Sequence, residues 1–149
     1  MKLYHNLFCR DIEAQLRFYQ GLLALPEAVH SRSPIYRAVE APGFQFGFHA
    51  SPAYGLLQLE NRAPTGDTPP TTGYPTFMLD TPAQVDAAAQ RAETLGAVRV
   101  KGPYPTYYGQ WQVVMTDPEG HVFRLSTDGL PEGVCAPTLA ACPGTPNST

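Results

Sequence analysis

The chain has 149 residues and a formal net charge of −3 at pH 7, a length typical of one domain that can bury a core without a disulfide or a metal. It contains no dense Lys/Arg run, which argues against nucleic acid and anionic membranes as partners, because both need concentrated positive charge. No apolar run approaches the ~18 residues of a membrane helix, and the first residues lack the layout of a signal peptide, so we expect a cytoplasmic protein.

The first half of the chain predicts a strand, a helix and three further strands. Residues 2–9 are rich in β-forming residues. Asp11 is suited to cap a helix, apolar residues then recur at helical spacing, and Pro26 stops the helix. The three further strands are predicted at residues 34–40, 44–49 and 55–60. Phenylalanine at every second position of the middle strand indicates one face buried in the core.

The second half repeats this order after a linker. Residues 62–73 are rich in Pro, Gly and Thr and offer almost nothing to bury. A strand at 74–79 is followed by the capping box Thr81-Pro82-Ala83-Gln84, and Gly96 ends the predicted helix. Strands are then predicted at about residues 97–101, 111–116 and 121–126. The last two are joined by Asp117-Pro118-Glu119-Gly120, which is typical of a type I turn.

The strand-to-helix start therefore occurs twice, with Asp11 and Asp80 69 residues apart. The same shift places His5 on Tyr74. A repeat of this length is a duplicated structural module, and two such modules enclose a cleft suited to a small ligand. We expect a domain at residues 1–128, with modules at about 1–61 and 74–128 around the linker, and an irregular tail at 129–149.

Two segments carry a resemblance to the vicinal oxygen chelate superfamily, which includes glyoxalase I, bleomycin-resistance proteins and extradiol dioxygenases. They are residues 5–23 and the strand–turn–strand at 111–125; the likeness spans about residues 2–127. The resemblance implies an α+β fold of two βαβββ modules that form facing half-barrels around a cleft, commonly as a homodimer. This superfamily usually has Gly where the chain has Ala24.

The resemblance also implies a divalent metal in many members, held by the first and last strands of each module. Here these positions fall at His5, Tyr74, Gln58 and Arg124. A permanent guanidinium cannot ligate a cation and repels it, and Tyr is a poor ligand at neutral pH. The sequence therefore predicts no metal and no other cofactor. A rearranged site with His5 and Glu60 as donors stays open as the alternative.

The candidate ligand-binding residues follow from the same positions and from an aromatic loop. Arg124 suits a carboxylate or phosphate because its fork is planar; alternatively it pairs with Glu60 or covers an exposed edge. The aromatic loop consists of residues 102–111. It either stacks on a planar ligand or packs on the core. The predicted contacts are His5, Gln58, Tyr74 and Arg124 as polar groups, with Tyr108 and Trp111 as apolar walls.

The favoured hypothesis is a small-molecule binding protein that holds an aromatic or anionic compound in the cleft without a metal. The alternative is a metal-dependent lyase, isomerase or dioxygenase, in which the ion polarises substrate oxygens. A protein-interaction module is the third possibility. The three cysteines form no C-x-x-C pair, and we expect no functional role for them; they are Cys9, Cys135 and Cys142.

Overall fold

A computed structural model describes residues 1–138. The first module consists of β1 (Leu3–Phe8), α1 (Ile12–Leu23), a 3-10 helix η1 (Val29–Ser31), β2 (Tyr36–Ala41) and β3 (Phe44–His49). The connecting segment contains α2 (Pro52–Leu56) and η2 (Glu60–Arg62). The second module consists of β4 (Thr76–Met78), α3 (Pro82–Thr94), β5 (Val98–Pro105), β6 (Gln110–Thr116) and β7 (Val122–Asp128). Cys142 and the end of the predicted tail lie outside the described residues.

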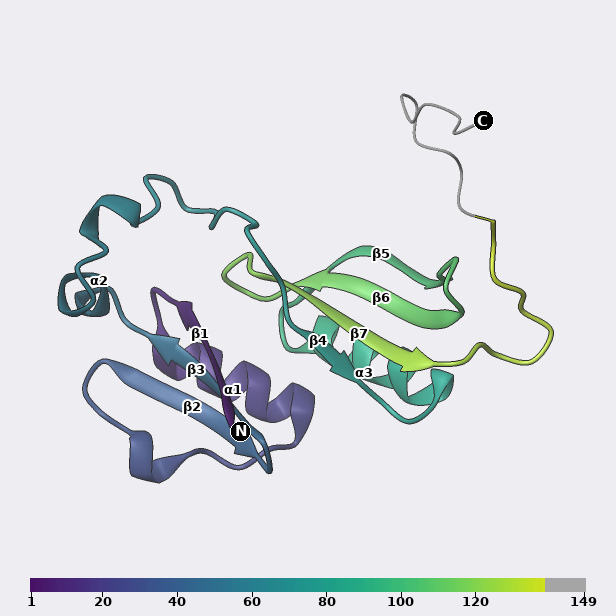
Figure 1. Ribbon diagram of the computed structural model, residues 1–149, viewed down its shortest axis with the longest axis horizontal. Helices are drawn as coiled ribbons and strands as arrows, with labels where there is room; N and C mark the ends of the chain where they lie inside the picture. Colours follow the sequence, from purple (N-terminus) through teal and green to yellow (C-terminus); the bar gives the residue numbers. More distant parts are fainter. Residues whose placement is uncertain (139–149) are drawn as a thin grey trace.

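Each module forms one open sheet with a helix on one face (Figure 1). The first sheet has the strand order β1-β3-β2 and the second has β4-β7-β6-β5. In both, the first strand runs parallel to the last strand of its module. The predicted α+β class with two modules is confirmed, and the sheets do not close into a barrel. Within residues 1–138 no helix is both long and apolar enough to cross a membrane.

The predicted strand at residues 55–60 is wrong, because this segment forms α2, η2 and the turn between them. Pro52 at the start of α2 favours a helix, and so short an apolar run fits helical spacing as well as strand spacing. The fourth strand position of the first sheet, beside β2, is held instead by a single antiparallel bridge between Glu27 and Val39.

The two long helices, α1 and α3, both begin at a side-chain cap. The Asp11 carboxylate accepts from the Ala14 amide at 2.9 Å, as predicted. The Thr81 hydroxyl accepts from the Gln84 amide at 3.2 Å and caps α3. The residue that matches Asp11 in the second module is therefore Thr81 and not Asp80, so the structural repeat is one residue longer than the sequence comparison indicates.

The core joins the two modules around Tyr19 of α1. Its ring is fully buried and lies against Phe46 and Phe48 of the first sheet and Phe77 and Phe123 of the second. Burial of this phenylalanine pair of β3 confirms the predicted core face. One aromatic ring thus contacts both sheets, so the modules share a single apolar core.

A buried carboxylate lies beside this core. Asp117, in the turn between β6 and β7, accepts from the Tyr19 hydroxyl at 2.8 Å and from the Gln15 amide at 2.9 Å. Its other oxygen accepts from the backbone amides of Glu119 and His121. Burial, with the Asp117 charge nearby, raises the pKa of Tyr19 well above 10, which keeps the phenol as a donor. The turn predicted from the sequence is therefore also the contact that fixes the second module to α1.

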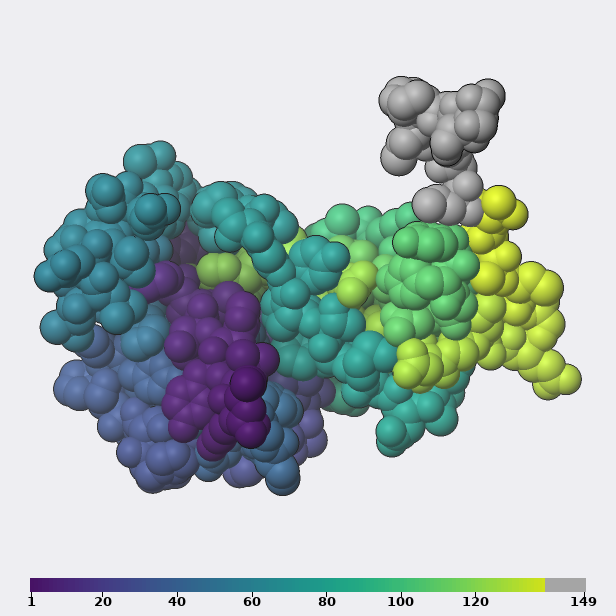
Figure 2. Space-filling model, viewed as in Figure 1, coloured from purple at the N-terminus to yellow at the C-terminus, as the bar shows by residue number. Residues whose placement is uncertain are grey.

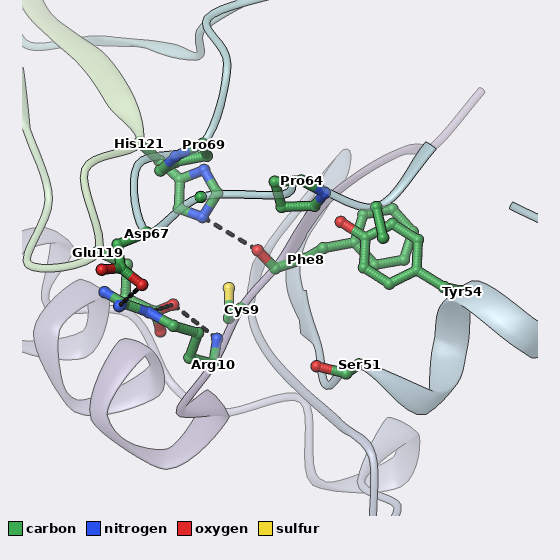
Figure 3. A pocket seen from close by; sticks show the side chains of 12 residues that line it. Phe8, Cys9, Arg10, Ser51, Tyr54, Pro64, Asp67, Pro69, Glu119 and His121 are labelled. Carbon is green, nitrogen blue, oxygen red and sulfur yellow. Dashed lines mark hydrogen bonds and ion pairs between the residues drawn. The ribbon is translucent and has the colours of Figure 1, made fainter. Parts of the chain in front are cut away.

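A second set of contacts surrounds this turn (Figure 3). The Glu119 carboxylate accepts from the backbone amides of Arg10 and Asp11 at 2.6 and 3.1 Å. His121 Nε2 lies 3.1 Å from the Phe8 carbonyl oxygen. These bonds hold the end of β1 against the start of β7, so they set the relative position of the modules.

We predict that Tyr19→Phe lowers the free energy of unfolding by about 1.5–3 kcal/mol, because a buried carboxylate loses a hydrogen-bond donor. Urea unfolding measures this change. Tyr107→Phe is the matched control, since Tyr107 is 54% exposed; it should change stability by less than about 0.5 kcal/mol. Equal effects of the two substitutions would contradict the role of Asp117 as the inter-module anchor.

We also predict that Ala24→Gly stabilises the protein. Ala24 follows α1 with φ 53° and ψ 37°, a left-handed conformation that costs a residue with a Cβ about 1–2 kcal/mol. After the entropic cost of glycine, a net gain of up to about 1 kcal/mol remains. Ala87→Gly, at an exposed position inside α3, should have the opposite sign, about 0.5–1 kcal/mol. Thermal unfolding of both variants checks the signs.

Candidate functional site

The face of the second sheet that α3 leaves open carries a polar cluster centred on Arg124 of β7. The Arg124 Nε donates to the Thr76 hydroxyl at 2.9 Å. Its Nη1 lies 3.2 Å from the Tyr108 hydroxyl and 3.4 Å from Gln112 Oε1. The guanidinium carbon lies 4.8 Å from the centre of the Tyr74 ring. We call these five residues the Arg124 cluster.

This cluster is positively charged and contains no acid. Within residues 1–138, Arg124 makes no ion pair with Glu60 or any other carboxylate. Lys101 of β5 adds a second cation, with its amine 4.0 Å from the centre of the Tyr104 ring, and the Tyr104 hydroxyl contacts Gln112. Lys101 is exposed, whereas Arg124 is partly buried without a counter-charge, which favours an anion at this face.

A cavity of about 400 Å³ lies where β1, β3 and β4 meet, and His5, Tyr74 and Thr76 are among its lining residues. Tyr74 and Thr76 belong to the Arg124 cluster as well, so the cavity and the cluster adjoin. The His5 ring stacks on Phe46, 5.5 Å between centres, and therefore lies on the helix side of the first sheet. Partial burial lowers the pKa of His5, so its imidazole is neutral at pH 7.

The structure brings together three of the six predicted ligand-binding residues, Tyr74, Tyr108 and Arg124, and places His5 beside them. Gln58 lies exposed in the turn after α2 with φ 56°. Trp111 lies on the opposite face of the second sheet, where its indole donates to Asp86 of α3 at 2.9 Å.

Sequence reasoning did not identify Thr76 and Gln112 as members of this face, and it named Tyr104 only as one ring of the aromatic loop. For Gln112 a signal exists, because it is a polar residue between Trp111 and Val113 in a strand of period 2. Thr76 carries no such signal. It reaches Arg124 only because β4 pairs with β7 in a register that sets these two residues side by side.

The strand register changes three of the four predicted metal positions. On the open faces the first and last strands present Asn6 and Gly47 in the first sheet and Thr76 and Arg124 in the second, in place of the predicted His5, Gln58 and Tyr74. This set supplies neither a carboxylate nor an imidazole, the groups that hold such metals. Within residues 1–138, no three His, Cys, Asp or Glu side chains gather into a possible metal site.

The cysteines offer no activated nucleophile in the described part of the chain. Cys9 is buried near the end of β1, and burial raises the pKa of its thiol. A protonated thiol is a poor nucleophile. Cys135 is exposed and lies after the last strand.

Comparison with known proteins agrees with the superfamily resemblance. The family model of a glyoxalase-like domain matches residues 3–126. The chain is similar to a glyoxalase/bleomycin resistance protein/dioxygenase family enzyme from Burkholderia phytofirmans PsJN, with 38% identity, a TM-score of 0.77, and coverage of 83% of this chain and 95% of that one. A glyoxalase-related enzyme from Fulvimarina pelagi shares the fold at 17% identity and TM-score 0.70, over 86% of this chain and 88% of that one. A search of curated proteins gave no match.

We predict that the protein loses stability as the pH falls below about 6.5. Burial lowers the pKa of His5 and His49 from the usual value of about 6.5. The unfolded chain therefore binds protons more readily, and the free energy of unfolding falls as the pH drops from 6.5 towards the lowered values. Urea unfolding at several pH values measures this decline.

A His5→Gln/His49→Gln double variant should flatten this decline, and an unchanged slope would contradict its assignment to these histidines. Glu27 and Glu93 do not contribute to this decline. Hydrogen bonds from arginines lower the pKa of Glu27 and Glu93, so their contributions are lost only below the usual glutamate value of about 4.3.

Proposed function

Because the chain belongs to the glyoxalase-like domain family, we propose that it binds a small aromatic anion at the Arg124 cluster without using a metal. One observation carries this proposal. Arg124 is partly buried, is held in place by Thr76 and lies over the Tyr74 ring, yet it has no carboxylate partner within residues 1–138. A ligand carboxylate would supply the missing charge.

The geometry of Arg124 favours a planar acid. Its Nε donates to the Thr76 hydroxyl and its Nη1 to the Tyr108 hydroxyl. Its Nη2 makes no hydrogen bond to the described residues. Since a guanidinium binds carboxylates through adjacent N–H groups in one plane, a carboxylate that meets Nη2 also competes for Nη1. The Tyr108 hydroxyl, which already contacts Nη1, is then free to turn towards the ligand.

The rings of Tyr74 and Tyr108 favour an aromatic body on that acid. They are 49% and 48% exposed although they flank a partly buried charge. Exposed tyrosines beside an anchoring cation offer large, rigid apolar contact area to a planar ligand. The adjoining cavity of about 400 Å³ is within the range of about 300–1,000 Å³ that holds small molecules.

The cluster supports binding better than chemical conversion. The side chains that contact Arg124 offer hydroxyls, an aromatic ring and an amide, and none of them is a carboxylate or an imidazole that could move a proton. The His5 imidazole lines the adjoining cavity but stacks on Phe46, on the helix side of the first sheet. We therefore infer sequestration of the ligand, which is the kind of function that the resemblance to bleomycin-resistance proteins implies. The metal-dependent alternative requires donors that the described residues do not assemble.

The proposal has two further parts, a homodimer, which rests on the family resemblance, and the cytoplasmic location expected from the sequence. A second copy would cover the open face of the sheets, where Tyr4, Tyr74 and Met78 are about half exposed. Light scattering of the purified protein measures the molecular mass and checks the dimer.

We predict that Arg124→Gln weakens binding of aromatic carboxylates by about 10- to 100-fold, because a charge-assisted hydrogen bond contributes about 1.5–3 kcal/mol. Calorimetric titration with a panel of benzoate and cinnamate derivatives measures the dissociation constants. Arg17→Gln is the matched control, since Arg17 is an exposed arginine of α1, and it should bind as the unchanged protein does.

The corresponding neutral amides provide a second control for the charge. They should bind weakly to the unchanged protein and equally weakly to Arg124→Gln. If carboxylates bind both forms with the same affinity, Arg124 is not the anchor and the proposal is wrong.

A further inference from the structure

A larger cavity, of about 650 Å³, lies between β1 and the segment that links the modules. We call it the linker cavity. The segment after α2 passes across the gap between the two modules before it enters β4 (Figures 1 and 2), and residues 59–73 contribute one side of the cavity. None of the five residues of the Arg124 cluster lines it, so it is a separate space.

The walls of the linker cavity are mainly aromatic rings and prolines. The rings of Phe8 and Tyr54 stack with centres 3.9 Å apart and an interplanar angle of 12°, and Pro64 lies near them (Figure 3). Pro69 and Pro70 continue the wall along the linker. Prolines have no amide hydrogen to satisfy, so this surface offers flat apolar contacts and few polar groups.

The linker is fixed in place at both modules, which gives the cavity a defined shape. The fully exposed Asp67 lies 3.9 Å from the Arg10 guanidinium, an ion pair that contributes little, so packing contacts hold the segment. Pro69 packs against the turn before β7 so closely that a methyl group at Gly120 would lie 3.3 Å from its Cδ. The stacked Tyr54 holds the other end of the segment on β1. A site whose walls are held in this way loses little entropy when a ligand binds.

The charged and polar groups of the linker cavity favour an anion. Arg62 of η2 is exposed and makes no ion pair within residues 1–138. Asn6 accepts from the Tyr36 hydroxyl through its oxygen at 2.8 Å, and its amide nitrogen has no acceptor among the described residues. No Asp or Glu lines the cavity. The imidazoles of His5 and His121 also line the cavity, and His121 Nε2 lies 3.1 Å from the Phe8 carbonyl oxygen. The lining therefore supplies one cation, one spare amide donor and two imidazoles without an opposing carboxylate.

From these observations we propose that the linker cavity is a second small-molecule site, which takes a planar aromatic anion independently of the Arg124 cluster. The aromatic body lies against the Phe8–Tyr54 pair and the prolines, and the anionic group faces Arg62. The volume is in the range that encloses drug-sized molecules, and it exceeds the cavity beside Tyr74. The site therefore accommodates a larger body than the first one does.

The test is a fluorescence titration with 8-anilinonaphthalene-1-sulfonate, a fused aromatic sulfonate that emits strongly in apolar surroundings. Because the Arg124 cluster is also expected to take aromatic anions, the titration is made on the Arg124→Gln variant. It should bind about one probe per chain in the linker cavity, and adding Arg62→Gln should weaken this binding about tenfold or more, because it removes the charged donor. Adding Arg17→Gln is the matched control and should leave this binding unchanged. Thermal unfolding of each variant checks that the fold is intact.

Two comparisons separate this proposal from the proposed function. Thr72→Trp, added to Arg124→Gln, places a large side chain at the exposed linker wall and should abolish the saturable signal. Arg124→Gln alone should keep the linker-cavity signal, even though that variant loses aromatic carboxylates. The proposal is overturned if Arg124→Gln alone gives no saturable signal, or if adding Arg62→Gln and adding Thr72→Trp both leave the binding unchanged.

Discussion

The buried carboxylate of Asp117 is the contact on which the arrangement of the two modules depends. It lies in a turn of the second module, yet two of its donors, Tyr19 and Gln15, belong to the first helix. An ionised carboxylate without its donors would be costly to bury, so the two helical side chains and the turn must stay together. The same Tyr19 ring contacts phenylalanines of both sheets. Polar and apolar constraints therefore select one relative position of the modules.

This position leaves β1 and β4 as neighbouring edge strands that do not pair with each other. Each has one hydrogen-bonded neighbour, β3 for β1 and β7 for β4, so the two sheets remain separate. Three cavities therefore lie along β1. The cavity beside Tyr74 and the linker cavity share His5, and the linker cavity shares Phe8 with the smaller pocket of Figure 3. Both proposed sites arise from strands that the modules bring together without joining.

The features that depend on local chemistry could be predicted from the sequence. The features that depend on how the strands pair could not. The Asp11 cap, the turn at Asp117 and the second module follow from residue types and spacing. The strand predicted at 55–60 failed because a short apolar run fits two periods and because the sequence does not show that the chain near Glu27 takes the strand position beside β2. That error carried over to the site, since Gln58 was selected for its assumed place on a strand. Arg124 was identified because its strand follows a recognisable turn.

The pairing registers also show that the two halves of the site are not equivalent, although the modules are copies of one plan. Gly47 occupies in the first sheet the place that Arg124 occupies in the second. The Tyr36 hydroxyl fills the space above Gly47, where a methyl group would lie 2.0 Å from its oxygen, and it is bonded there to Asn6 and Gln45. The first half is thus closed by the protein's own hydrogen bonds, while the second half presents a cation without a partner. A ligand at the junction therefore meets one charged anchor and not two, which suits a monoanion better than the pair of vicinal oxygens that a central metal would hold.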